Sequence, residues 1–182
     1  LYTSPHLKDY RERITINGKP ISENYVCDFI NKNKSFFEAN ELSFFEMSVG
    51  LAFEYFVKEK TDINIIEVGM GGRLDSTNII TPLISVITNI GLDHTQFLGN
   101  TLEAIAFEKA GIIKPRRPVI TGIRQKKAFD VIARASSEKS SPCFQLGKDF
   151  RVRKNRKGTF SYFGIDTILR DMKTGLAGNF QV

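Results

Sequence analysis

The stretch Glu67-Val68-Gly69-Met70-Gly71-Gly72-Arg73-Leu74-Asp75-Ser76-Thr77-Asn78 decides the fold that we predict for this chain. It continues a short apolar run at 64–69, and such a run ending in glycines is typical of a buried strand in a parallel sheet. The glycines allow the backbone to approach a ligand closely. Two interpretations of Glu67 stay open. It is either a functional carboxylate at a strand end, or the partner of Arg73 beside a turn that the glycines shape.

Two further apolar runs, at 83–90 and 118–122, are bounded by glycine or proline and predict more strands of the same sheet. Helices are expected at 102–113, which Pro115 stops, and at 126–139. Strands that alternate with helices predict an α/β fold with a mostly parallel sheet, flanking helices and right-handed crossovers.

The segments on either side differ in character. Upstream, Ser22 is a good N-cap for a helix, and a second helix is expected at 44–58, apolar nearly all the way round and therefore buried. Downstream of Pro142, runs at 143–146, 150–153, 159–163 and 166–169 predict a small antiparallel β appendage with a hairpin tip at 155–158. We therefore expect a central α/β domain over 1–142, and an appendage over 143–182 that returns to it.

Composition narrows the class of protein. The chain has 182 residues, 41% hydrophobic and 25% charged, which excludes a disordered tail and a disulfide-stapled mini-protein. No apolar run approaches the roughly 20 residues that span a bilayer. The net charge of +6 fits an anionic partner without choosing among nucleic acid, phosphates and polycarboxylates. The isolated Cys27 and Cys143 indicate a reducing compartment, so we expect a cytoplasmic protein.

Two more candidate sites follow predicted strands or lie in a helix. His94 comes after the run at 83–90, but a lone histidine is more often structural than a ligand, and Asp93 beside it could cap a helix. Lys109 shares a helical face with Ile105 and Ile112. It is either a lysine that keeps its ammonium in water or a desolvated lysine that reacts as a neutral amine.

Two negative conclusions concern phosphate and nucleic acid. A P-loop closes in Gly-Lys-Ser or Gly-Lys-Thr, and neither Gly18-Lys19 nor Gly147-Lys148 is followed by a hydroxyl residue. A cluster of basic residues falls on the predicted hairpin, and we interpret it as a solvated turn and not as a nucleic-acid surface. The cluster comprises Arg151, Arg153, Lys154, Arg156 and Lys157.

Taken together, the candidate segments resemble the folylpolyglutamate synthase/dihydrofolate synthase family of the Mur ligase superfamily. The resemblance covers residues 1–123 strongly, weakens through the appendage, and recovers at Gly175, Leu176 and Gly178. The matching segments are 1–7 (LYTSPHL), 10–14 (YRERI), 17–18 (NG), 43–46 (SFFE), 67–78, 87–94, 98–102 (LGNTL) and 108–115.

The resemblance implies an ATP- and magnesium-dependent ligase. Such an enzyme phosphorylates the carboxylate of dihydropteroate or a folate, and the amine of L-glutamate then displaces phosphate to form an amide. The implied partners are these small molecules, with no nucleic acid and no membrane. The oligomeric state stays open, although a dimer or a swapped assembly would be unsurprising if a sheet edge is uncovered.

The resemblance also assigns roles to individual residues. Glu67 and His94 match the magnesium-binding positions, and Lys109 matches a lysine that is carbamylated in the superfamily. Arg73, Asp75 and Asn78 match a run that borders the nucleotide and acceptor sites, with Ser76 in place of the more usual Ala. The family's folate-site edge corresponds to Ser4, Pro5, His6, Arg11 and Arg13.

The family's P-loop and C-terminal domain have no counterpart in these 182 residues. We therefore expect a central-domain fragment that has no ligase activity alone and binds nucleotide weakly, because phosphoryl transfer depends on positioning and charge neutralisation. Two alternatives remain. One is another Mur-type amino-acid ligase acting on a cell-wall precursor, and the other is a non-catalytic binding module.

Overall fold

The computed structural model describes residues 1–155 and 158–174. The chain divides into two compact units, Leu1–Ile80 and Thr81–Val182. We expected a division near residue 142, so the division found falls about sixty residues earlier. Each unit has its own hydrophobic core and is described separately.

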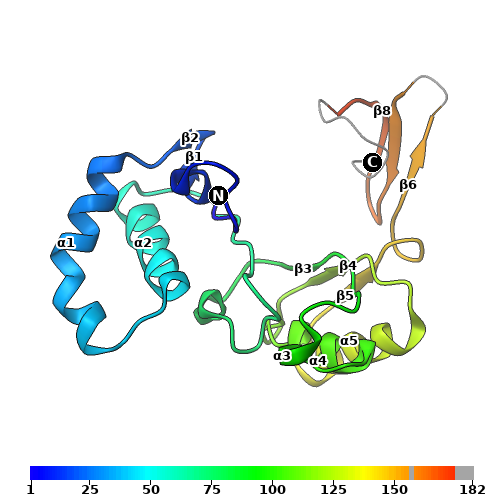
Figure 1. Cartoon of the computed structure of the whole chain (residues 1–182). Coiled ribbons are helices and arrows are strands. Elements are labelled where there is room, and N and C mark those ends of the chain that lie inside the picture. The colour runs from blue at the N-terminus through cyan, green and yellow to red at the C-terminus, as the bar shows by residue number, and fades with distance from the viewer. Residues whose placement is uncertain (156–157, 175–182) are drawn as a thin grey trace. The chain divides into compact units, whose positions relative to one another are not determined.

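The first unit is mainly helical (Figure 1). Its elements are the 3-10 helix η1 (Tyr10–Arg13), the strands β1 (Thr15–Ile16) and β2 (Lys19–Pro20), the helices α1 (Glu23–Ala39) and α2 (Phe44–Lys58), and the 3-10 helix η2 (Ser76–Ile79). β1 and β2 form a tight hairpin because Asn17 and Gly18 both adopt positive φ, as a two-residue hairpin turn requires.

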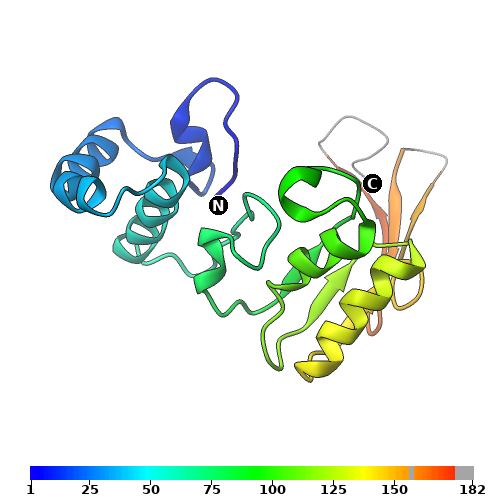
Figure 2. The same cartoon turned by 60° about the horizontal axis from the view of Figure 1, so that its bottom comes forward.

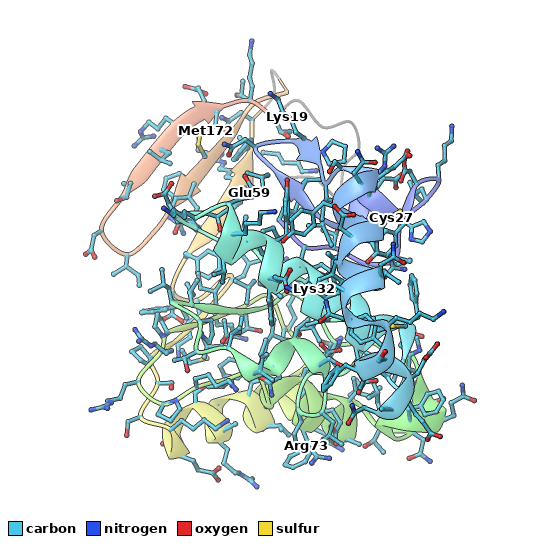
Figure 3. All side chains as sticks on the ribbon, turned by 90° about the vertical axis from the view of Figure 1, so that its left-hand side faces the viewer. Lys19, Cys27, Lys32, Glu59, Arg73 and Met172 are labelled. Carbon is cyan, nitrogen blue, oxygen red and sulfur yellow. The ribbon has the colours of Figure 1, made fainter. Side chains whose placement is uncertain are left out.

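Both long helices have a serine N-cap, and Ser22 is the one that the sequence predicts. The hydroxyl of Ser22 accepts the N–H of Tyr25. Ser43 and Glu46 form a capping box at the start of α2. Figure 3 shows Cys27 and Lys32 projecting from α1. α2 is less enclosed than its composition suggests, because Phe44 and Val57 are 55% and 79% exposed.

The core of the first unit joins the opening segment to both helices. It is built from Tyr2, Ile14, Ile21, Phe29, Val49, Leu51, Ala52 and Phe56. Burial of these side chains supplies the main stabilising free energy of the unit. The run at 64–69, expected as a full strand, is shorter in the structure. It pairs with Tyr2 through a single parallel bridge at Ile66.

The second unit contains a three-stranded parallel sheet in the order β3-β4-β5. Its strands and helices are β3 (Ser85–Ile87), α3 (Thr95–Leu98), α4 (Leu102–Ala110), β4 (Val119–Thr121), α5 (Lys126–Glu138) and β5 (Cys143–Gln145). Figures 1 and 2 show α4 and α5 on one face of this sheet. The core of the second unit lies between the sheet and these two helices, and it includes Ile87, Ile105, Val119 and Ile132. On the other face Val86 is 53% exposed, so burial alternates along β3.

β5 corrects one expectation. We placed 143–146 in the antiparallel appendage, but Cys143–Gln145 pairs in parallel with β4. The reason is topological. α5 separates β4 from β5, and a helical crossover returns the chain in the same direction, which gives a parallel pair.

The antiparallel sheet follows in the order β6-β7-β8, formed by Arg151–Lys154, Phe160–Phe163 and Ile168–Met172. It confirms the three later strands that the sequence predicts, and Met172 marks the end of β8 in Figure 3. Five positions that we singled out lie outside the described residues. They are Arg156, Lys157, Gly175, Leu176 and Gly178. No helix of the described residues is long and apolar enough to cross a membrane.

Candidate active site

Glu67 is held beside the opening segment of the chain. The N–H of Tyr2 donates to the Ile65 carbonyl at 2.8 Å, and the N–H of Glu67 donates to the Tyr2 carbonyl at 2.9 Å. This backbone pairing brings the Glu67 carboxylate to Ser4, whose N–H donates to Oε2 at 2.7 Å. The Glu67 side chain is exposed. It therefore combines a fixed position with an open side, which suits a cation ligand.

The loop after Glu67 is folded by its own polar side chains. Asp75 accepts the N–H of Met70 at 2.9 Å through Oδ2. Its Oδ1 accepts both the N–H of Thr77 at 2.9 Å and the hydroxyl of Thr77 at 2.5 Å. The side-chain amide of Asn78 donates to the Arg73 carbonyl at 3.1 Å. Asp75 and Asn78 thus fix the shape of the loop that carries Arg73.

Gly69 is needed because an aromatic ring lies against it. A Cβ atom on Gly69 would overlap the Phe45 ring, with Cε2 at 2.7 Å. Phe45 also lies 6.3 Å from the Tyr2 ring, measured between centroids. The Gly-rich loop therefore packs on the first turn of α2, and Phe45 belongs to the candidate site although we did not single it out from the sequence. The SFFE match at the start of α2 was the signal that could have identified it.

The two arginines of the opening segment, Arg11 and Arg13, are engaged within the first unit. Arg11 pairs with Asp9 at 2.6 Å and with Glu23 at 3.4 Å. The hydrogen bond from Arg11 lowers the pKa of Asp9 to about 2. Arg13, which is buried, donates from Nε to Nδ1 of His6 at 2.8 Å.

Aromatic residues complete this part of the first unit. The guanidinium of Arg13 lies 5.3 Å from the centroid of Phe44. The Tyr10 hydroxyl donates to Oγ of Ser48 at 3.2 Å, and burial raises the pKa of Tyr10. Tyr2 is fully buried, its hydroxyl has no hydrogen-bond partner among the described residues, and burial raises its pKa to about 12.

His94 lies in the second unit, at the N-cap of α3, with left-handed backbone angles φ 49 and ψ 35. Its N–H donates to Oδ1 of Asp93 at 2.8 Å, and Nε2 lies 3.7 Å from Oδ2 of the same carboxylate. Asp93 therefore orients His94 and does not itself cap the helix. The His94 side chain is 52% exposed, so the imidazole is accessible to a ligand.

Lys109 occupies the last turn of α4, whose N-cap Thr101 accepts the N–H of Ala104 at 3.1 Å. Lys109 is partly buried, and Ala106 and Ala110 on the same helix are buried. Glu67 belongs to the first unit, whereas His94 and Lys109 belong to the second. Among the residues described, no group of three His, Cys, Asp or Glu side chains forms a metal site.

Comparison with known proteins places these observations in a family. The family model of the Mur ligase middle domain matches residues 26–182. The dihydrofolate synthase/folylpolyglutamate synthase of Bacillus subtilis is 39% identical over 192 residues, covering 99% of this chain and 44% of that protein. The chain thus spans less than half the length of this relative.

Solved structures agree with this comparison. The Escherichia coli FolC complex with DHPP and ADP is 31% identical with a TM-score of 0.90, covering 98% of this chain and 42% of that one. A complex of folylpolyglutamate synthase (FPGS) with AMPPCP and folate is 36% identical with a TM-score of 0.91, covering 99% and 47%. The chain therefore belongs to the Mur ligase middle-domain family, and within it is similar to folylpolyglutamate and dihydrofolate synthases.

Proposed function

We propose that the protein containing this chain is an ATP-dependent ligase that adds L-glutamate to dihydropteroate or to a folate. The observation that carries the proposal is the likeness over 98–99% of the chain to the two complexes described above, one with DHPP and ADP and one with AMPPCP and folate. The exposed Glu67 carboxylate beside the Gly-rich loop supports it further.

The proposed reaction has two steps. The carboxylate of the pterin-bearing acceptor attacks the γ-phosphorus of ATP, which forms an acyl phosphate and releases ADP. The amine of L-glutamate then attacks the acyl carbon, the bond to the phosphate oxygen breaks, and an amide forms with loss of a proton from nitrogen. Catalysis of such a transfer depends on position and on charge neutralisation.

Magnesium would be held by Glu67, His94 and Lys109, the last as a carbamate. When bound, Mg²⁺ neutralises the phosphate charge during transfer. The donor set fits in part. Glu67 is an exposed carboxylate, which Mg²⁺ prefers, whereas the imidazole of His94 is a less usual ligand. A neutral Lys109 amine takes up carbon dioxide with loss of a proton, and the product is an anionic oxygen ligand.

Other proposed roles follow the local structure. Arg73, Asp75 and Asn78 would border the nucleotide and acceptor. Asp75 and Asn78 act there by shaping the loop, since their side chains are bonded to it. Ser4, whose N–H bonds to Glu67, would edge the folate site together with Pro5. His6, Arg11 and Arg13 would edge the folate site, with Arg13 and His6 acting as a hydrogen-bonded pair.

The test is ADP release in the presence of L-glutamate, with dihydropteroate, tetrahydrofolate and a cell-wall nucleotide precursor as acceptors. Both the complete reading-frame product and the 182-residue chain are assayed. We expect pterin-dependent turnover from the complete product only, because the 182 residues contain no Walker A motif. Turnover with the cell-wall acceptor alone would favour another Mur-type ligase. Absence of turnover in both would favour a non-catalytic binding module.

A further inference from the structure

One face of the β6-β7-β8 sheet gathers arginines around an aromatic ring. Arg151 and Arg153 lie two positions apart on β6 and therefore share a face. Arg151 is paired directly with Phe163 of β7, and Phe163 is paired with Ile168 of β8, two positions before Arg170. Directly paired residues lie on the same face of a sheet. We call the four residues Arg151, Arg153, Phe163 and Arg170 the arginine face.

The ring of Phe163 positions two of the guanidinium groups. The guanidinium carbon of Arg151 lies 5.0 Å from the ring centroid, and that of Arg170 lies 6.0 Å from it. These contacts come from the strands on both sides of β7. Cation–π attraction restrains long side chains that would otherwise move freely, so less conformational entropy is lost when an anion binds.

The positive charge of the arginine face is not neutralised within the described part of the chain. All three arginines are exposed, and no ion pair there involves them. Two nearby acids already accept other hydrogen bonds. Asp149 accepts the N–H of Gln145 at 2.7 Å, and Asp171 accepts from the Asn155 side chain at 3.0 Å. A third acid, Asp166, lies in the turn between β7 and β8, and no ion pair of the described residues joins it to these arginines.

The chemistry of these groups selects the class of ligand. A guanidinium presents a planar fork of donors that matches a carboxylate. A single-stranded nucleic acid would instead need a free aromatic surface for base stacking, but two guanidinium groups already contact the Phe163 ring. Arginines on the two outer strands suit a ligand with several successive carboxylates. Strands are spaced about 4.8 Å apart, so such a ligand would extend across the sheet.

We propose that the arginine face binds the oligo-γ-glutamate chain of a polyglutamylated substrate or product. The proposal rests on the proposed function, which supplies a ligand carrying one free carboxylate per added glutamate. It changes our interpretation of the basic cluster. Arg151 and Arg153 belong to an ordered strand with an aromatic partner across it, and not to a solvated turn.

The test measures binding of fluorescently labelled penta-γ-glutamate to the 182-residue chain by fluorescence anisotropy, without ATP or pterin. The variants are the pair Arg151→Gln and Arg153→Gln together, the same two positions changed to Lys, and Arg170→Gln. Arg134→Gln on α5 is the matched control, because it removes an exposed arginine of the same unit outside the sheet. Far-UV circular dichroism checks that each variant is folded.

We expect the double Gln variant to weaken binding about tenfold or more, and the double Lys variant to weaken it less, because Lys keeps the charge but loses the fork. Arg134→Gln should leave the Kd unchanged. Equal weakening by Arg134→Gln, no binding by the unmodified chain, or equal binding of a penta-γ-glutamate in which every free carboxylate is amidated would overturn the proposal. Tighter binding of pentathymidylate, lost in the same variants, would replace it with a nucleic-acid surface.

The outcome is separable from that of the proposed function. Ligase turnover with an acceptor that carries no glutamate chain is measured on the complete product. Turnover without penta-γ-glutamate binding refutes the arginine face alone. Binding that is lost with the arginines, together with no pterin-dependent ADP release, refutes the ligase and leaves a polycarboxylate site.

Discussion

The carboxylate of Glu67 accepts the backbone N–H of Ser4 at 2.7 Å, although 63 positions separate the two residues. The bond ties the Gly-rich loop to the first residues of the chain. It also orients a carboxylate whose side chain remains exposed. Both the shape of the first unit and the proposed chemistry therefore depend on the same pair.

Glu67→Gln in the complete product separates these two roles. The glutamine side-chain carbonyl can still accept the Ser4 N–H, so the fold should be kept while the negative charge is lost. We expect the Mg²⁺ concentration for half-maximal rate to rise by about tenfold to a hundredfold, and turnover to fall. A magnesium titration of ADP release measures this. Glu59→Gln, at the exposed C-cap of α2, is the control. An unchanged magnesium dependence would remove Glu67 from the proposed ligands.

Lys109→Ala tests the proposed carbamate. The variant loses the only group that could carry it, so turnover should fall by about a hundredfold or more. Small carboxylates such as acetate should restore part of the rate, because they supply an anionic oxygen at the same place. Lys148→Ala, at an exposed position after β5, should keep full activity and show no response to acetate. Full activity of Lys109→Ala without any addition would end the carbamate assignment.

Gly69→Ala should destabilise the chain, because the added Cβ overlaps the Phe45 ring. Overpacking of this kind costs about 1–3 kcal/mol of unfolding free energy. The midpoint of urea unfolding should fall accordingly. Gly91→Ala is the control, since nothing lies within 4 Å of the Cβ built there.

The double variant Gly69→Ala with Phe45→Leu strengthens the same test. If the ring is the obstacle, its removal should recover part of the loss, which makes the two substitutions non-additive. Identical midpoints for Gly69→Ala and Gly91→Ala would show that the loop does not pack on Phe45.

The lowered pKa of Asp9 predicts that the stability of the folded state depends on pH in the acid range. This pKa is lowered from 3.8 to about 2, mainly by the hydrogen bond from Arg11. A lowered carboxyl pKa stabilises the folded state fully above the unfolded pKa, and the contribution is lost as the pH falls from about 4 through about 2. NMR titration of the Asp9 carboxyl carbon should give a midpoint near 2. Arg11→Gln should return it towards 3.8. A midpoint near 3.8 in the unmodified chain would contradict the pairing.

Local signals in the sequence predicted most of the secondary structure. Ser22 marks a helix start because its hydroxyl accepts one of the first free N–H groups, an effect that needs no tertiary information. Strand positions at 85–87 and 119–121 were also within the predicted runs. The direction of β5 was missed, because three residues carry no periodicity that separates a parallel from an antiparallel partner.

The sequence predicted which residues belong to the candidate site, but it did not predict which groups they contact. The sequence identified Glu67 but left its partner open between Arg73 and a ligand. The structure records the Ser4 N–H as one partner, a long-range backbone contact that no local pattern encodes. In the same way Arg11 and Arg13 were predicted to meet a substrate, whereas Asp9 and His6 already bond to them. A charge in a sequence gives no information on whether a neighbour will neutralise it.

The left-handed backbone at His94 has a consequence for mutational scanning. Only glycine and, among side-chain residues, chiefly Asn, Asp and His adopt such angles readily. In a saturation library at this position, β-branched replacements would score poorly even if the imidazole had no chemical role. Both His94→Asn and His94→Gly keep the left-handed backbone. Comparing these two variants with the unmodified protein would therefore isolate the contribution of the imidazole. A ranking of all nineteen substitutions by activity would combine two effects: how readily each residue adopts the left-handed backbone angles, and whether its side chain can replace the imidazole as a ligand.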